Sequence, residues 1–259
     1  MKVQEDARRM NYEDRFSEIV VEDEDHVKKI ASITADRMEK IFGISFRLTE
    51  KGPQEPKIPV VVFAETYDAI IDHLVKRKKG LIKLDSERSS HDYNSFKINF
   101  ANRFVIGFDN VDNENDEKDG NYMIYINDIR DGKAVEEPLE PDEDPSKKTT
   151  EWINQNITEH PEAIKMISIE AREHLKKLGI GFTNHELIFP IFCTMYDVLV
   201  DYMDLFRKET NEYFQEINFA GCFFVAAYEN EEGGSDIVFR PSIDSKTALK
   251  DDATSGSSN

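Results

Sequence analysis

Two pairs of acidic residues in the C-terminal half of the chain have a spacing suited to metal binding. Glu170 and Glu173 are three residues apart, and Asp201 and Asp204 repeat this spacing after 27 intervening residues. On packed helices, carboxylates three residues apart lie on one face, and such oxygen ligands suit a hard cation such as Mg²⁺. The four residues are therefore candidate ligands for a magnesium-dependent hydrolysis of nucleotide phosphates.

The spacing of these acids gives only weak support for a metal site, because the whole chain is rich in acids. Asp and Glu make up 52 of 259 residues, about one fifth, so about ten acid pairs three residues apart arise by chance. All-α nucleoside-triphosphate pyrophosphatases hold magnesium in this way, but they are wholly helical and this sequence also predicts strands. Asp197, Asp201 and Asp204 also fit an ordinary solvent-exposed stripe of a helix.

A second acidic stretch has the composition of a calcium loop. Placing Gly120 at the sixth position of an EF-hand puts Ile126 at the twelfth, where it cannot chelate calcium. We interpret residues 109–120 as a hairpin turn whose acids keep the sheet soluble and face a partner. Six carboxylates form this predicted interaction surface: Asp109, Asp112, Glu114, Asp116, Glu117 and Asp119.

The other reactive residue types form no catalytic pattern. The six histidines match no zinc motif, and the segment that ends in His174, EAREH, lacks the first histidine of HExxH. The sequence contains no glycine-rich phosphate loop and no Gly-x-Ser-x-Gly elbow. Cys193 and Cys222 lie in apolar runs, which favours two buried thiols over a disulfide. We expect no cofactor, and no metal beyond the weak candidates above.

The net charge of −19 is unevenly distributed along the chain. Residues 109–145 alone hold 14 acidic and 3 basic side chains. Because so acidic a chain repels phosphates, we expect no direct nucleic-acid binding and no membrane binding. A protein partner with a basic surface, or solubility alone, would explain the charge.

The sequence begins with no signal-peptide pattern and has no long apolar run, so we expect a cytoplasmic or intracellular location, a virion included.

Hydrophobic periodicity predicts several helices. We expect them at residues 25–42 and 65–79, and at residues 161–178 and 187–206, with a short helix around Trp152. The segment 187–206 is apolar nearly all round, which indicates a central buried helix. Pro190 should either kink that helix or mark its true start.

Alternation of large apolar residues predicts an aromatic-rich antiparallel meander of strands at residues 95–100, 103–108 and 121–129. We also expect strands at 44–49, 60–64 and 81–84, and two strands joined by a Gly-Gly turn within 218–241. The predicted fold is α+β: an N-terminal region of helices and antiparallel sheet, then a helical region with a central buried helix and a C-terminal β-hairpin.

Five segments follow from these patterns: an N-terminal arm at 1–22, an α+β domain at 23–130, an acidic proline-rich linker or loop at 131–148, a helical region with the hairpin at 149–241, and a flexible tail at 242–259.

We expect a non-enzymatic protein that works through macromolecular contacts, an assembly component or accessory factor, for instance of a viral particle. One alternative is an acidic inhibitor that mimics nucleic acid, a role for which the acids at 197, 201 and 204 are suited. The other is the magnesium phosphohydrolase. Self-association through free sheet edges is also open.

Overall fold

The computed structural model describes residues 11–47, 52–78, 95–111, 121–130, 137–182, 184–210, 212–231 and 233–242. The elements of these residues, in chain order, are α1 (Tyr12–Ile19), α2 (Glu24–Phe42), α3 (Lys57–Lys78), β1 (Ser95–Phe100), β2 (Phe104–Val111), β3 (Asn121–Asp128), α4 (Pro145–Asn156), α5 (Pro161–Lys177), the short 3₁₀ helix η2 (His185–Leu187), α6 (Ile188–Thr210), β4 (Phe214–Phe219), β5 (Phe223–Glu229) and β6 (Ser235–Pro241).

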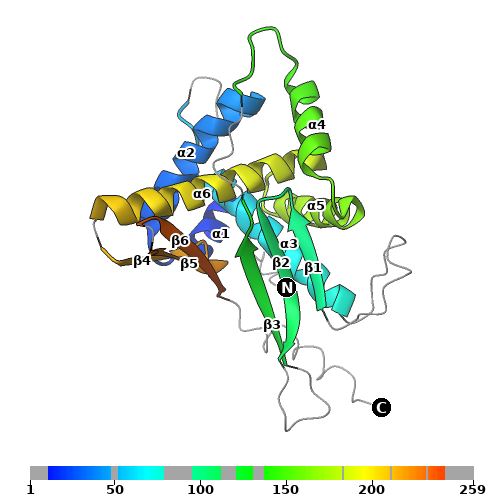
Figure 1. The fold of residues 1–259 in the computed structure, drawn as a ribbon. Coiled ribbons are helices and arrows are strands. Elements are labelled where there is room, and N and C mark those ends of the chain that lie inside the picture. Colours follow the sequence, from blue (N-terminus) through cyan, green and yellow to red (C-terminus); the bar gives the residue numbers. More distant parts are fainter. Residues whose placement is uncertain are drawn as a thin grey trace, which may run out of the picture.

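The fold is α+β, as the sequence predicts. The described strands form two antiparallel sheets, each with three strands in sequence order, β1-β2-β3 and β4-β5-β6. In the first sheet Ile98 pairs with Ile106 and Phe100 with Phe104, so the predicted meander is confirmed. Figure 1 shows α6 running across both sheets, with α2 and α4 rising on its other side.

The helices predicted from periodicity are confirmed and end near the expected residues. Gly43 caps α2 in the left-handed conformation with φ of 63°, which glycine adopts without the steric cost of a side chain. A Cβ at this position would lie 3.2 Å from Leu139 and Pro145. Helix α6 begins at Ile188, so Pro190 lies in its first turn and marks the start of the helix instead of a kink.

Two strand predictions in the N-terminal half are wrong. Residues 60–64, predicted as a buried strand, belong to α3, which begins eight residues before the predicted helix. They are at most 1% exposed because α3 packs against α1, α2, α5 and α6, and a helix buried on every side has no amphipathic period. At residues 44–47 the chain forms only an isolated bridge between Arg47 and Gln54. The strand predicted at 81–84 lies outside the described residues.

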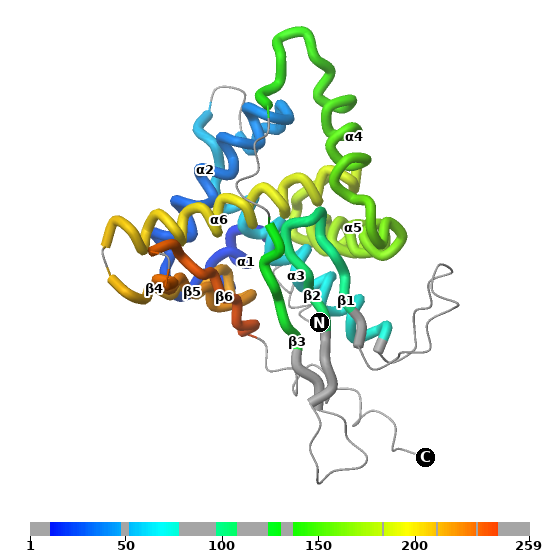
Figure 2. The backbone as a smooth tube through the Cα atoms, in the orientation of Figure 1, coloured from blue at the N-terminus to red at the C-terminus, as the bar shows by residue number. Residues whose placement is uncertain are grey.

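The linker predicted at 131–148 is shorter than expected. Its last residues belong to α4, which starts with Pro145 in the first turn and with Asp144 accepting a hydrogen bond from the Ser146 backbone. Figure 2 shows residues 137–144 reaching from the end of α2 to α4. The backbone N–H of Leu139 donates to the carbonyl of Lys40, which fixes this segment to α2.

The C-terminal hairpin of β5 and β6 is confirmed, and a third strand, β4, precedes it. In β4, Ile217 and Phe219 face the core and alternate with more polar neighbours. The predicted strand structure starts at residue 218, so the first four residues of β4, 214–217, were not predicted.

Aromatic rings connect the helices to both sheets within a single hydrophobic core. Phe63 of α3 stacks on Phe192 of α6 with ring centroids 4.4 Å apart. Tyr196 of α6 packs against Phe104 at 4.5 Å and against Phe239 at 5.3 Å, and therefore joins the two sheets. The expected central role of α6 is confirmed, since most of its side chains are buried.

A buried ion pair fixes the first sheet to α6. Arg103, in the β1–β2 turn, donates from Nε to Oδ2 of Asp197 at 2.7 Å, and both residues are at most 5% exposed. The Arg103 guanidinium also donates to the carbonyl of Ala101 and to Asn156, and it lies 5.0 Å from the centroid of Trp152. A charge this deep is tolerated because its hydrogen-bonding groups are satisfied on several sides.

Candidate functional site

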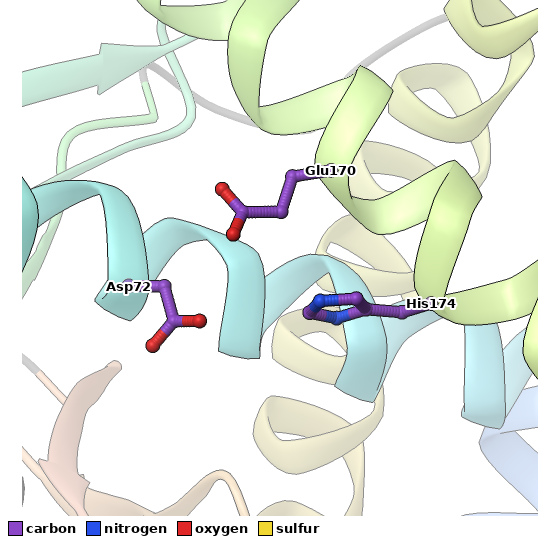
Figure 3. A group of neighbouring side chains, drawn as sticks. All are labelled: Asp72, Glu170 and His174. Atoms are coloured by element: carbon purple, nitrogen blue, oxygen red, sulfur yellow. The ribbon is translucent and has the colours of Figure 1, made fainter.

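Asp72, Glu170 and His174 form a group with the donor atoms of a metal site. Glu170 and His174 are four residues apart on α5 and therefore lie one turn apart on the same face of that helix. Helix α3 packs against α5 and contributes Asp72. One possible ligand atom from each residue lies within 4.8 Å of those from the other two. Figure 3 shows Glu170 and His174 extending from α5 toward the side of α3 that carries Asp72.

Glu65 and Lys76 hold the two α5 side chains in this group. Glu65 Oε2 lies 3.4 Å from Nδ1 of His174, and the hydrogen bond between these groups raises the pKa of His174 above its usual value. Burial raises the pKa of Glu65, but hydrogen bonds from His174 and Arg15 outweigh burial and lower it overall. Lys76 Nζ forms an ion pair with Glu170 Oε1.

Arg15 extends this charge network to α1. Its guanidinium contacts Glu65 Oε1 and Asp68 Oδ2, both at 2.7 Å. Burial and the nearby carboxylate of Glu65 raise the pKa of Asp68 to about 6, although Arg15 opposes the shift. The two carboxyls that share this guanidinium therefore shift in opposite directions, the pKa of Glu65 downward and that of Asp68 upward.

His73 lies on α3 next to Asp72 but is buried, with 1% exposure. Burial lowers its pKa to about 4, so the ring is neutral near pH 7. Its Nε2 atom has no hydrogen-bond partner among the described residues. The side chain is therefore a neutral imidazole inside the α3–α5 region.

The acid pairs predicted as magnesium ligands have separate partners in the structure. Glu170 belongs to the group above, which is the only such group in the described part of the chain and lacks the other three candidates. Glu173 lies 3.5 Å from Arg172, and Asp204 lies 2.7 Å from Lys208. Asp201 contacts the guanidinium groups of Arg37 at 3.4 Å and Arg130 at 3.5 Å.

The interpretation of Asp197, Asp201 and Asp204 as a solvent-exposed stripe is wrong for Asp197. Its side chain is 3% exposed, and it contacts Arg103 in the β1–β2 turn and Arg130 just after β3, at the same end of the first sheet. Sequence analysis missed Asp72 and His174 as partners of Glu170. The four-residue spacing of Glu170 and His174 was a readable signal, but nothing in the sequence pointed to Asp72.

The acidic turn predicted as an interaction surface falls largely beyond the described residues. Asp109 lies in β2, where its backbone is paired with Ser95 on one side and with Met123 on the other. Asp112, Glu114, Asp116, Glu117 and Asp119 lie outside the described residues. The role of this surface stays a prediction.

The second sheet has an outer face that carries apolar and charged side chains together. Side chains alternate between the two faces along a strand, and directly paired residues share a face. Ile217, Val225 and Phe239 are paired and buried, which identifies the inner face. We call the opposite side the outer face; its residues are Phe214, Glu216, Asn218, Phe224, Ala226, Tyr228, Asp236, Val238 and Arg240.

Side chains on the outer face support one another while leaving apolar surface exposed. Phe214 packs on Tyr228 with ring centroids 5.0 Å apart. Arg240 lies 4.6 Å over the ring of Phe224 and 3.4 Å from Glu216. Phe214 is nevertheless 41% exposed and Val238 is 49% exposed.

Both cysteines are buried, as predicted. Burial raises the pKa of the Cys222 thiol well above its usual value, so the reactive thiolate form is disfavoured. Neither residue has the exposed, electropositive surroundings of a nucleophile.

Comparison of the chain with protein-family models, with curated protein sequences and with solved structures returned no match. Within the described residues, no helix combines the length and the apolar character needed to cross a membrane.

Proposed function

We propose that this protein acts by binding another protein, whose surface is basic and partly apolar, through the outer face of the second sheet. The observation that carries the proposal is the exposure of Phe214 and Val238 on a regular sheet, next to the acids Glu216 and Asp236. Exposed apolar side chains surrounded by polar groups are typical of protein-binding surfaces.

The sheet supports such a role because its inner face is anchored. Ile217, Val225 and Phe239 are at most 7% exposed, and β5 and β6 both contact α6. The outer side chains therefore stand on a backbone that is already ordered. Binding to an ordered surface loses less conformational entropy than binding that must first fold a segment.

Charge favours a basic partner. The chain carries a net charge of −19, and on the outer face Glu216 and Asp236 outnumber the single cation, Arg240. Charges at the edge of an interface steer encounter and select partners of opposite sign. An assembly component or accessory factor fits this mode of action.

A nucleic-acid mimic would also bind a basic partner, but its expected acids on α6 are poorly placed. Asp197 is buried, while Asp201 and Asp204 are held in ion pairs with Arg37, Arg130 and Lys208. The apolar groups of the outer face also suit a protein surface better than a groove shaped for phosphates.

Affinity capture from the source organism, followed by binding measurements with the purified partner, tests the proposal. Val238→Asp should weaken binding at least tenfold, because it places a charge where an apolar side chain of the outer face is 49% exposed. Ile33→Asp is the matched control, since Ile33 is a branched aliphatic residue, 37% exposed, on α2. Its affinity should equal that of the wild type, and added salt should weaken the wild-type complex.

Equal binding by Val238→Asp and the wild type would overturn the proposal. Sedimentation of the purified chain covers the case of self-association: a dimer that Val238→Asp disrupts, without another captured protein, would identify a second copy as the occupant. Displacement of the captured protein by DNA would instead support nucleic-acid mimicry.

A further inference from the structure

We propose that Asp72, Glu170 and His174 bind one divalent cation of the zinc class, between α3 and α5. The proposal is independent of the protein-binding role, since it concerns a different part of the molecule. Two carboxylates and one imidazole are a donor set that zinc accepts, and three protein ligands leave a further position for water. Asp72 is exposed, and the side chains of Glu170 and His174 are 25% and 26% exposed, so an ion can reach them from solvent.

The contact between Glu65 and His174 prepares the imidazole to be a ligand. A neutral histidine has one N–H and one nitrogen with a free lone pair. Since Glu65 lies at Nδ1, the ring that donates there has its lone pair on Nε2. A carboxylate behind a metal-bound histidine is the usual means of fixing the tautomer and increasing the basicity of the ligand.

The distances are compatible with an ion after a small adjustment. The three ligand atoms lie within 4.8 Å of one another. Around a tetrahedral zinc with bonds of about 2.0–2.1 Å, ligand atoms are roughly 3.4 Å apart. Since none of these separations exceeds 4.8 Å, the ligand atoms need to move inward by at most about 1 Å, which rotation of partly exposed side chains can supply.

Local charge favours a cation. Four carboxylates, those of Glu65, Asp68, Asp72 and Glu170, face three permanent cations, Arg15, Lys76 and Lys177. Lys76 forms an ion pair with one oxygen of Glu170, so it would compete with a metal for that carboxylate. Removing the lysine charge should consequently strengthen metal binding.

Titration of the full chain, without a polyhistidine tag and after treatment with a chelator, tests the site. Calorimetry with Zn²⁺ should give one ion per chain, and Co²⁺ should develop the visible absorption of a bound ion with nitrogen and oxygen ligands. His174→Gln and Asp72→Asn should each weaken Zn²⁺ binding at least tenfold, and Glu65→Gln should weaken it about tenfold through the orientation of His174. Lys76→Met should strengthen it severalfold.

Glu173→Gln is the matched control, because it removes one negative charge from α5 outside the group. Its Zn²⁺ affinity should stay within twofold of the wild type, while circular dichroism of the ion-free variants shows that each one folds. The proposal is overturned if Asp72→Asn, His174→Gln and Glu173→Gln bind Zn²⁺ like the wild type, which would mean weak binding to scattered surface acids. An unchanged or weaker affinity in Lys76→Met would equally contradict the assigned geometry.

Discussion

The ion pair between Arg103 and Asp197 gives the sharpest stability prediction. Arg103→Met keeps an apolar stem of similar length but leaves the Asp197 carboxylate, at 2% exposure, without its hydrogen bond of 2.7 Å. Removing one partner of a buried pair costs about 3–5 kcal/mol, because the remaining charge is uncompensated. Arg130 Nη1 remains 3.6 Å from Oδ1 of Asp197, so we expect the lower end, about 3 kcal/mol.

The double variant Arg103→Met/Asp197→Leu separates the two contributions to this cost. It leaves neither charge of the pair buried alone, and Arg130 keeps its contacts with Asp128 and Asp201. We therefore expect the double variant to lose about 2 kcal/mol less than the sum of the two single variants, since replacing both partners avoids the uncompensated charge.

Urea unfolding followed by fluorescence measures these changes, because Trp152 is the single tryptophan and packs against Arg103. With an m value of about 3 kcal/mol per molar urea, a loss of about 3 kcal/mol lowers the midpoint by about 1 M. Circular dichroism should give the same midpoint if unfolding is cooperative.

The exposed pair of Lys208 and Asp204, also 2.7 Å apart on α6, is the control. Lys208→Met should cost at most about 0.5 kcal/mol. A cost below about 1 kcal/mol for Arg103→Met, or strict additivity in the double variant, would refute the reasoning.

Two further predictions concern the backbone and pH. Gly43→Ala should cost about 2 kcal/mol in unfolding free energy, and Gly179→Ala about 1 kcal/mol. Both residues have positive φ, but only a Cβ at Gly43 would meet neighbours, Leu139 and Pro145. Equal costs would contradict the packing explanation. Asp68 has its pKa raised from 3.8 to about 6, so its charge destabilises the fold increasingly as pH rises from about 4 to 6. Its side chain is 37% exposed, and after allowance for solvent screening we expect Asp68→Asn to gain about 1 kcal/mol relative to the wild type between pH 4 and pH 7. A pH-independent difference between the two unfolding curves would argue against this assignment.

The sequence predicted those elements whose two faces meet different surroundings. Residues 25–42 and 161–178 have one apolar side, and residues 97–100 and 104–106 alternate between the core and a more open side, so periodicity identified both helices and strands. The strand prediction at residues 60–64 failed for the opposite reason. They are buried all round in α3, and a short continuous apolar run has the same appearance in a buried strand as in a buried helix.

The candidate metal group could be predicted only in part. Glu170 and His174 share a face of α5, a relation that their four-residue spacing already contains. Asp72 joins them because α3 packs beside α5, almost a hundred residues away in the chain. No local pattern encodes which helix pairs with which, so the third ligand required the tertiary structure.

The acids of α6 illustrate how burial changes the meaning of a sequence pattern. Asp197, Asp201 and Asp204 are spaced as a single stripe, yet their side chains are 3%, 20% and 29% exposed as the helix leaves the cover of the first sheet. Asp197 contacts Arg103 and Arg130, and Asp201 contacts Arg130. These ion pairs neutralise both carboxylates within the fold and hold the meander against α6. An acidic residue inside an otherwise apolar helix thus predicts an arginine from another element, because a buried carboxylate requires a partner. It follows that a basic partner protein would have to meet carboxylates outside this stripe, such as Asp236 of the outer face, whereas Glu216 is already paired with Arg240.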